Sequence, residues 1–153
     1  MERIASFNVD HRYIIPGVYI SRIDGDITTY DIRTRKPNTG ELMTNAEMHS
    51  TEHLFATFIR NSEIANQVIY FGPMGCQTGY YLLIKNADNK EVIEIIKKTL
   101  IDIINYAGEM PGKSEIECGN YKNLDVEVAK QDCKKYYEKI KNIEEKDLKY
   151  PKE

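Results

Sequence analysis

Two histidines four positions apart, His49 and His53, stand in a stretch whose flanking residues predict a helix. Side chains four apart on a helix share one face, with Cβ atoms about 5–6 Å apart, so both imidazoles can bind one transition metal. Glu52 projects from the neighbouring arc, close enough to exchange protons with a metal-bound molecule. H-x-x-E-H is the inverted form of a zinc-hydrolase motif and indicates a metal enzyme. A helix can also carry two surface histidines without a metal, so further ligands are needed.

The three cysteines differ in their surroundings. Cys133 falls on the apolar stripe of a predicted helix, where a free cysteine behaves as a small hydrophobic residue. Cys118 lies in a loop-like segment before that helix and is one candidate for a third metal ligand, because loops on a rigid scaffold often carry ligands. The competing candidates are His11, Cys76 and Glu127. Two histidines and one thiolate would leave a fourth position open for water or substrate, as in catalytic sites.

Cys76 stands in a predicted turn between Gly75 and Gly79. Glycines permit backbone conformations that other residues resist, and they leave a neighbouring thiol poorly covered. A thiol near a cation can act as a base or nucleophile, because the thiolate is the reactive form. The alternative is a turn cysteine that only fills space. In the pair Cys118-Gly119, we expect Gly119 to let the backbone turn closely around the sulfur of Cys118 if that sulfur binds a metal.

The composition favours one soluble domain, residues 1–153, with a core of its own. With 21 Lys+Arg against 24 Asp+Glu, the net charge is −3, so the chain lacks the basic field that nucleic-acid binding requires. The apolar runs are too short to span a membrane, and the first residues lack a secretory signal pattern. An odd number of cysteines argues against a disulfide framework. We therefore expect a cytoplasmic protein that binds neither nucleic acid nor membrane.

The pattern of strand-forming residues predicts two strand pairs. Residues 18–24 and 27–33 are rich in β-branched and aromatic side chains and flank an Asp-Gly turn, which is a hairpin signal. Residues 67–72 and 78–85 form the second pair. Because the turns within each pair are too short for parallel crossovers, we expect an antiparallel β-sheet. Helices packed on one face of it give an α+β sandwich, and its uncovered strand edges favour a homodimer.

Three helices are predicted from capping signals and periodicity. Thr44 and Asp88 each precede a glutamate by three positions, which predicts a capping box at the start of two helices. We expect the first helix to run to about Asn61 and the second to continue until Met110-Pro111-Gly112. A third begins near Asp125. The expected buried side chains of the last two helices are Val92, Ile95, Ile96, Ile103, Ile104, Ala129, Cys133, Tyr136 and Ile140.

Several separate segments together resemble the S-ribosylhomocysteine lyase (LuxS) family. The main ones are residues 49–54 (HSTEHL), 72–81 (GPMGCQTGYY) and 117–120 (ECGN). The resemblance continues at Ser6-Phe7, at Asp10-His11 and at Tyr30-Asp31-Ile32-Arg33, and it runs in order from about residue 5 to residue 130. The block P-M-G-C-x-T-G is far more specific than H-x-x-E-H alone.

The resemblance implies a homodimeric, metal-dependent lyase that cleaves the thioether of S-ribosylhomocysteine. Its products would be homocysteine and 4,5-dihydroxy-2,3-pentanedione, the precursor of the quorum-sensing signal autoinducer-2. The sugar carbonyl would migrate through enediolates until the thiolate leaves by β-elimination, which needs a Lewis acid and a proton carrier. The family typically uses one Fe(II) per subunit, with Zn(II) as another occupant. By the family pattern its ligands would be His49, His53 and Cys118.

The family pattern also assigns catalytic and substrate-binding residues. Cys76 would carry protons between carbons, and Glu52 would transfer protons to and from oxygen. The residues that would line the substrate pocket, at the interface of two subunits, are Ser6, His11 and Arg33. Two positions depart from the pattern. Thr51 replaces a bulky apolar residue, and Tyr70 replaces an aspartate six positions before the catalytic cysteine.

Two other functions fit the residues less completely. A small metallopeptidase would use His49, His53 and a downstream carboxylate, with Glu52 activating water. That function gives no role to Cys76 or Cys118. A non-catalytic, metal-stabilised dimeric module would hold a fully coordinated metal, whereas no fourth ligand at short spacing is evident in the sequence.

Overall fold

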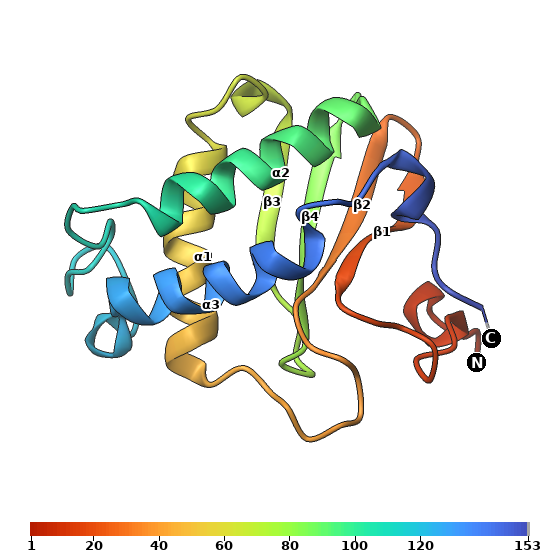
Figure 1. The fold of residues 1–153 in the computed structure, drawn as a ribbon, viewed down its shortest axis with the longest axis horizontal. Helices are drawn as coiled ribbons and strands as arrows, with labels where there is room; N and C mark the ends of the chain where they lie inside the picture. Colours follow the sequence, from red (N-terminus) through yellow and green to blue (C-terminus); the bar gives the residue numbers. More distant parts are fainter. Residues whose placement is uncertain (153) are drawn as a thin grey trace.

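Three helices pack against one face of a four-stranded antiparallel sheet in the computed structural model, which describes residues 1–152 (Figure 1). The strand order is β1-β2-β4-β3. The strands are β1 (Gly17–Asp24), β2 (Ile27–Arg33), β3 (Val68–Pro73) and β4 (Gly79–Lys85). The predicted α+β fold is confirmed.

The predicted hairpin of β1 and β2 is confirmed, with Gly25 in the left-handed conformation that such a tight turn requires (φ 59°). β4 pairs antiparallel with both β2 and β3, so the second predicted strand pair joins the first in one sheet. Arg33 at the end of β2 faces Gly79 at the start of β4. The end of β2 therefore lies beside the turn of residues 74–78.

The helices are α1 (Asn45–Ile59), α2 (Asn89–Ile104) and α3 (Val126–Ile140). Thr44 and Glu47 form the predicted reciprocal capping box at the start of α1. Asp88 caps α2 by accepting two backbone N–H bonds, without the reciprocal glutamate bond that the sequence pattern predicts. Residues 1–152 also contain four short 3-10 helices, η1 (Ala5–Asn8), η2 (Ala65–Gln67), η3 (Tyr121–Asn123) and η4 (Glu145–Leu148).

The prediction that α2 continues to Met110-Pro111-Gly112 is wrong, since the helix ends at Ile104 with Asn105 as its C-cap. Residues 105–108 include asparagine and glycine, which are weak helix formers. The chain then turns away from the helix, and the Pro111 carbonyl comes within 2.9 Å of Nδ1 of His53 on α1. Ile104, predicted to be buried, is only partly buried at this helix end.

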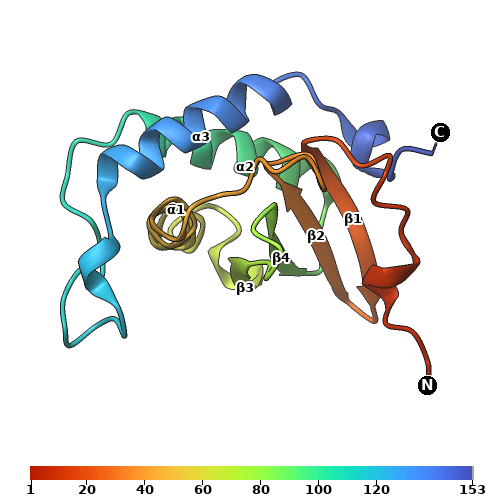
Figure 2. The same cartoon turned by 90° about the horizontal axis from the view of Figure 1, so that it is seen from below.

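The core lies between the sheet and the helices (Figure 2). Phe71 of β3 stacks on Phe55 of α1 and on Tyr80 of β4, with ring centroids 4.3 Å and 4.9 Å apart. Burial of such aromatic rings fixes α1 on the sheet. The two termini lie at the same end of the molecule, beside β1 (Figure 1). Across residues 1–152, no helix has the length and apolar character needed to cross a membrane.

Candidate active site

Two helix residues and one loop residue bring three metal-ligating atoms together. The Sγ atom of Cys118 lies 3.3 Å from Nε2 of His49 and 3.7 Å from Nε2 of His53. All three ligand atoms lie within 4.8 Å of one another, and all three residues are half-buried. Tetrahedral zinc bonds of about 2.0–2.3 Å place nitrogen and sulfur ligands about 3.6 Å apart. The group therefore has the spacing of a metal site and could hold one metal ion.

The hydrogen bonds of the two imidazoles orient their ligand atoms. His49 Nδ1 lies 2.7 Å from the side-chain oxygen of Asn123, and His53 Nδ1 lies 2.9 Å from the backbone oxygen of Pro111. Both oxygens only accept, so each Nδ1 must donate its proton. Each Nε2 then carries a lone pair that faces Cys118, as in metal sites whose histidines are oriented by a second hydrogen bond.

The backbone of residues 112–119 shapes the loop that carries Cys118 and lets it approach His53. The Cys118 N–H donates to the Ser114 carbonyl at 3.1 Å. Gly112 adopts a left-handed φ of 72°, and a Cβ atom there would lie 3.0 Å from Nδ1 of His53. Only glycine combines that backbone conformation with so close an approach to the ring. The predicted close turn of the backbone around the Cys118 sulfur is present, since the Asn120 N–H donates to Sγ at 3.5 Å. The turn does not require glycine, because a Cβ atom at Gly119 would meet nothing within 4 Å.

The competing ligand candidates lie elsewhere. His11 Nδ1 contacts the Val9 carbonyl at 2.8 Å. Glu127 forms an exposed ion pair with Lys130. Over residues 1–152, His49, His53 and Cys118 form the only group of three that could hold a metal. Cys133 is buried in the core as predicted, and burial raises the pKa of its thiol to about 12.

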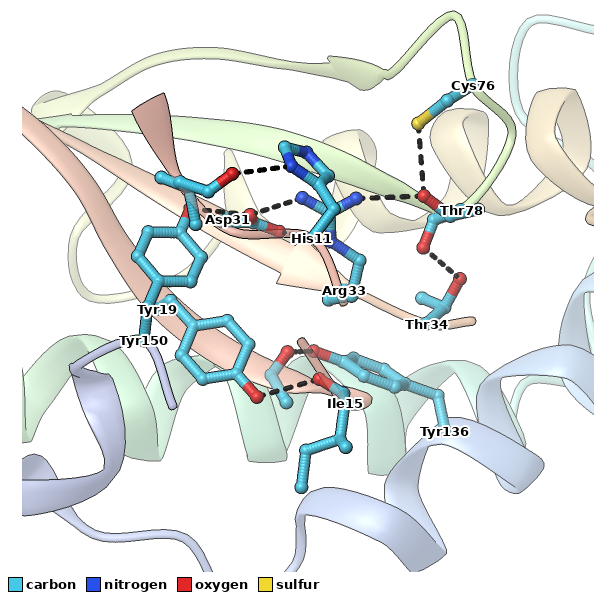
Figure 3. A network of polar contacts seen from close by, with 12 residues as sticks. His11, Ile15, Tyr19, Asp31, Arg33, Thr34, Cys76, Thr78, Tyr136 and Tyr150 are labelled. Carbon is cyan, nitrogen blue, oxygen red and sulfur yellow. Dashed lines mark hydrogen bonds and ion pairs between the residues drawn. The ribbon is translucent and has the colours of Figure 1, made fainter. Parts of the chain in front are cut away.

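Cys76 is exposed in the turn between β3 and β4. Its Sγ lies 3.0 Å from the Thr78 hydroxyl, which also accepts a 2.9 Å hydrogen bond from Arg33 (Figure 3). The left-handed residue of this turn is Gln77 (φ 64°), so the predicted role of the flanking glycines in the turn conformation is wrong. Gly79 is required for another reason, because a Cβ atom there would lie 2.6 Å from the Ile32 backbone oxygen.

Arg33 is almost fully buried and forms a two-point ion pair with Asp31. Nη2 lies 2.6 Å from Oδ2, and Nε lies 3.1 Å from Oδ1. Burial alone would lower the pKa of Arg33, but the Asp31 carboxylate outweighs burial and raises it. A permanent positive charge therefore lies one hydroxyl group away from the Cys76 sulfur.

The remaining predicted site residues are Glu52 and Ser6. Glu52 is half-buried on α1, directly before His53. Ser6 lies in η1 and lines an open depression of about 390 Å³ together with Tyr70 and Tyr81. The hydrogen bonds of the histidines lead to Asn123 and Pro111, whereas those of Cys76 lead to Thr78 and Arg33. Within one subunit these are separate networks.

The sequence model of the S-ribosylhomocysteinase (LuxS) family matches residues 4–147. The chain belongs to this family. Among similar LuxS proteins, the S-ribosylhomocysteine lyase of Borreliella afzelii (strain PKo) is 43% identical, over 99% of this chain and 100% of that protein. The S-ribosylhomocysteine lyase of Finegoldia magna is 44% identical, over 99% of each chain. That of Clostridium beijerinckii is 43% identical over the same shares.

The LuxS match covers every predicted site residue from Ser6 to Cys118. The residues that sequence reasoning missed are those that support the ligands, namely Asn123, the Pro111 carbonyl and Gly112. Asn123 contacts His49, whereas Pro111 and Gly112 lie beside His53. Each is at least 58 positions from its histidine in the sequence, and no local motif marks it. Thr78 could have been noticed, since it stands inside the specific block around Cys76.

The two departures from the LuxS pattern occupy different environments. Thr51 is buried, its hydroxyl has no hydrogen-bond partner within the described structure, and it lines a cavity of about 10 Å³ beside Tyr80. Tyr70 is half-exposed on the edge strand β3 and lines the same depression as Ser6. Neither contributes a ligand atom to the metal-binding group.

Proposed function

We propose that this chain is a metal-dependent S-ribosylhomocysteine lyase, with residues 1–153 as one catalytic domain. The products would be homocysteine and 4,5-dihydroxy-2,3-pentanedione, the precursor of autoinducer-2. The observation that carries the proposal is the cluster of His49, His53 and Cys118 in a chain of the LuxS family. The exposed Cys76 does not belong to this cluster. The printed names of the relatives support the same substrate.

The ligand set suits a divalent transition metal. Imidazole nitrogen and thiolate sulfur bind iron and zinc well, and we propose Fe(II) as the native metal with Zn(II) as the alternative. When bound, the cation would supply Lewis-acid stabilisation of negative charge on the sugar oxygens. Three protein ligands leave a position for substrate, which a closed structural site would not.

The proton transfers are assigned to Cys76 and Glu52. Moving a carbonyl along the sugar requires a base that takes a proton from one carbon and returns it to the next. We assign this step to the Cys76 thiolate, which the Thr78 hydroxyl and the charge of Arg33 hold in place. Glu52, on the same helix as the histidines, would move protons to and from the substrate oxygens and assist the final elimination of the thiolate.

In a homodimer, the hydrogen-bond network of the metal-binding histidines in one subunit would lie beside the network of Cys76 in the other. We propose that the sites lie at the subunit interface and that Ser6, His11 and Arg33 contact the substrate there. In support, the N-terminal segment exposes large apolar side chains that a subunit interface would remove from water. These side chains are Ile4, Phe7 and Ile15. Light scattering that reports a single-subunit mass for the active enzyme would contradict the interface proposal.

The three free cysteines fit a reducing compartment, and we propose a cytoplasmic location. The metallopeptidase alternative is not favoured, because the third ligand atom comes from Cys118 and not from a carboxylate. The non-catalytic alternative is not favoured either, because the relatives are named as lyases.

The proposal is tested by incubating iron-loaded protein with S-ribosylhomocysteine and following free thiol with a colorimetric reagent. We expect thiol release that depends on substrate and stops after the metal is removed by a chelator. Restoring Fe(II) or Co(II) should restore the reaction. Absence of thiol release from intact, metal-loaded protein would overturn the proposal.

A further inference from the structure

A chain of hydrogen bonds joins the C-terminal segment to the turn of Cys76 (Figure 3). The Tyr150 hydroxyl donates to Oδ2 of Asp31 at 2.6 Å. Asp31 accepts two bonds from Arg33, which donates in turn to the Thr78 hydroxyl. That hydroxyl contacts the Cys76 sulfur at 3.0 Å. Tyr150 and Cys76, the two ends of this series of contacts, lie 74 positions apart in the sequence.

The interior of this chain of contacts is shielded from water. Asp31 is 0% exposed, Arg33 3% and Thr78 3%. Hydrogen bonds in such surroundings are stronger than on the surface, and a lost partner is costly because water cannot replace it. Loss of the hydrogen bond at Tyr150 is therefore expected to alter the contact between Thr78 and Cys76.

The donor at each step is defined by chemistry. Burial raises the pKa of Tyr150, and the Asp31 charge raises it further, so the phenol stays protonated and donates. A guanidinium only donates, so the Thr78 oxygen must accept from Arg33. The Thr78 hydrogen is then free to point at the sulfur. Tyr150 and two N–H groups of Arg33 donate to Asp31. The third Arg33 bond and the Thr78 hydroxyl are instead directed toward Cys76, an arrangement suited to a thiolate.

Stacking against a second aromatic ring holds Tyr150 beside Asp31. Tyr150 stacks on Tyr19, with centroids 4.9 Å apart and planes at 23°. Tyr150 lies three positions beyond the segment matched by the family model, residues 4–147. The contact to Asp31 therefore adds a component that the matched segment does not contain.

We propose that Tyr150 is a positioning residue for Cys76, acting through the Asp31–Arg33 ion pair. With its hydroxyl in place, one Asp31 oxygen is shared between the phenol and the guanidinium. Without it, the carboxylate draws Arg33 closer and weakens the bond to Thr78. The proposal rests on the catalytic role of Cys76 in the proposed function, but the reactivity of that thiol can be measured without lyase activity.

The test is Tyr150→Phe, which removes the hydroxyl and keeps the stacked ring. Native wild-type and variant protein are treated with iodoacetamide at neutral pH, and modification of Cys76 is followed by peptide mass spectrometry. We expect the alkylation rate to fall about two- to tenfold, the range for one lost hydrogen bond. The turnover number for S-ribosylhomocysteine should fall by a similar factor, with less change in KM.

The matched control is Tyr19→Phe, which removes the hydroxyl of the stacked partner. That hydroxyl donates to the Ile15 carbonyl and does not reach Asp31. This variant should alkylate at the wild-type rate. In a second arm, Tyr150→Phe is combined with Thr78→Val. Because the two side chains act in one chain of contacts, the double variant should lose less than the product of the two single losses.

A purely structural role predicts a lower melting temperature for Tyr150→Phe with an unchanged alkylation rate of Cys76, and that result would overturn the proposal. Equal effects of Tyr150→Phe and Tyr19→Phe would overturn it as well. If the wild-type protein released no thiol from S-ribosylhomocysteine, the proposed function would fail. The alkylation rates would still decide whether Tyr150 positions Cys76.

Discussion

Nδ1 of His49 lies 2.7 Å from the side-chain oxygen of Asn123, on the short helix η3 that leads into α3. This contact fixes the proton on Nδ1 and leaves Nε2 free to bind a metal. The orientation of a ligand on α1 therefore depends on a residue 74 positions later in the chain.

Asn123→Ala should weaken metal binding. The variant loses the acceptor that orients His49, and the loss of such a partner typically costs about 10–100-fold in metal affinity. Competition with a chromophoric chelator measures this change. Asn123→Asp keeps an acceptor oxygen and should bind the metal nearly as well as the wild type. Equal affinities in Asn123→Ala and the wild type would show that the contact does not orient the ligand.

Gly112→Ala should displace the imidazole of His53 from its position in the metal-binding group. The added Cβ would approach His53 Nδ1 to 3.0 Å, and the left-handed backbone would cost about 1–2 kcal/mol. We expect a lower free energy of unfolding in urea and weaker metal binding. Gly119→Ala, where a Cβ meets nothing within 4 Å, is the matched control and should change neither. Similar losses in both variants would contradict this account of Gly112.

Cys76→Ala and Glu52→Gln should fold, bind metal and lose most turnover, because each positioned acid–base group contributes about 10²–10⁴-fold in rate. Cys118→Ala should instead lose the metal. The thiolate-to-metal absorption of a cobalt-substituted sample separates the two classes, since it should persist in the first two variants and disappear in the third. Near-normal turnover in Cys76→Ala or Glu52→Gln would reject its assigned role.

Cys133 makes stability depend on pH. Burial raises the pKa of its folded thiol to about 12, whereas an unfolded thiol has a pKa of about 8.5. The unfolded state therefore releases its proton first, and the contribution of Cys133 to stability, fully present below about pH 8.5, declines as pH rises toward 12. The decline is at most about 1.4 kcal/mol per pH unit.

Cys133→Ala lacks this titration and serves as the reference. Urea unfolding at several pH values from neutral to about pH 10 should show the stability advantage of the wild type shrinking above about pH 8.5. A difference between the two proteins that stays constant over this range would show that the thiol is not buried in its neutral form.

Local signals predicted much of the fold. The Thr44–Glu47 capping box and the turn at Gly25 are decided by residues next to one another, and the structure confirms both. The end of α2 was not predictable from Pro111, because the chain leaves the helix earlier to reach His53. Local patterns describe turns and caps well and tertiary contacts poorly.

The candidate site divides in the same way. The histidines of α1 were evident from their spacing, and the specific block around Cys76 marked the turn. Asn123, Gly112 and Tyr150 were not evident, because each acts on a residue far away in the sequence. No spacing rule connects such pairs, so only the folded chain reveals them.

The most direct test of the central claim is the reaction of the iron-loaded protein with S-ribosylhomocysteine in D₂O, with both products identified by mass spectrometry. Carbonyl migration followed by elimination adds no water and returns solvent protons to carbon. We therefore predict homocysteine together with a pentanedione that carries carbon-bound deuterium. Ribose without carbon-bound deuterium, the product of simple hydrolysis, would contradict the account.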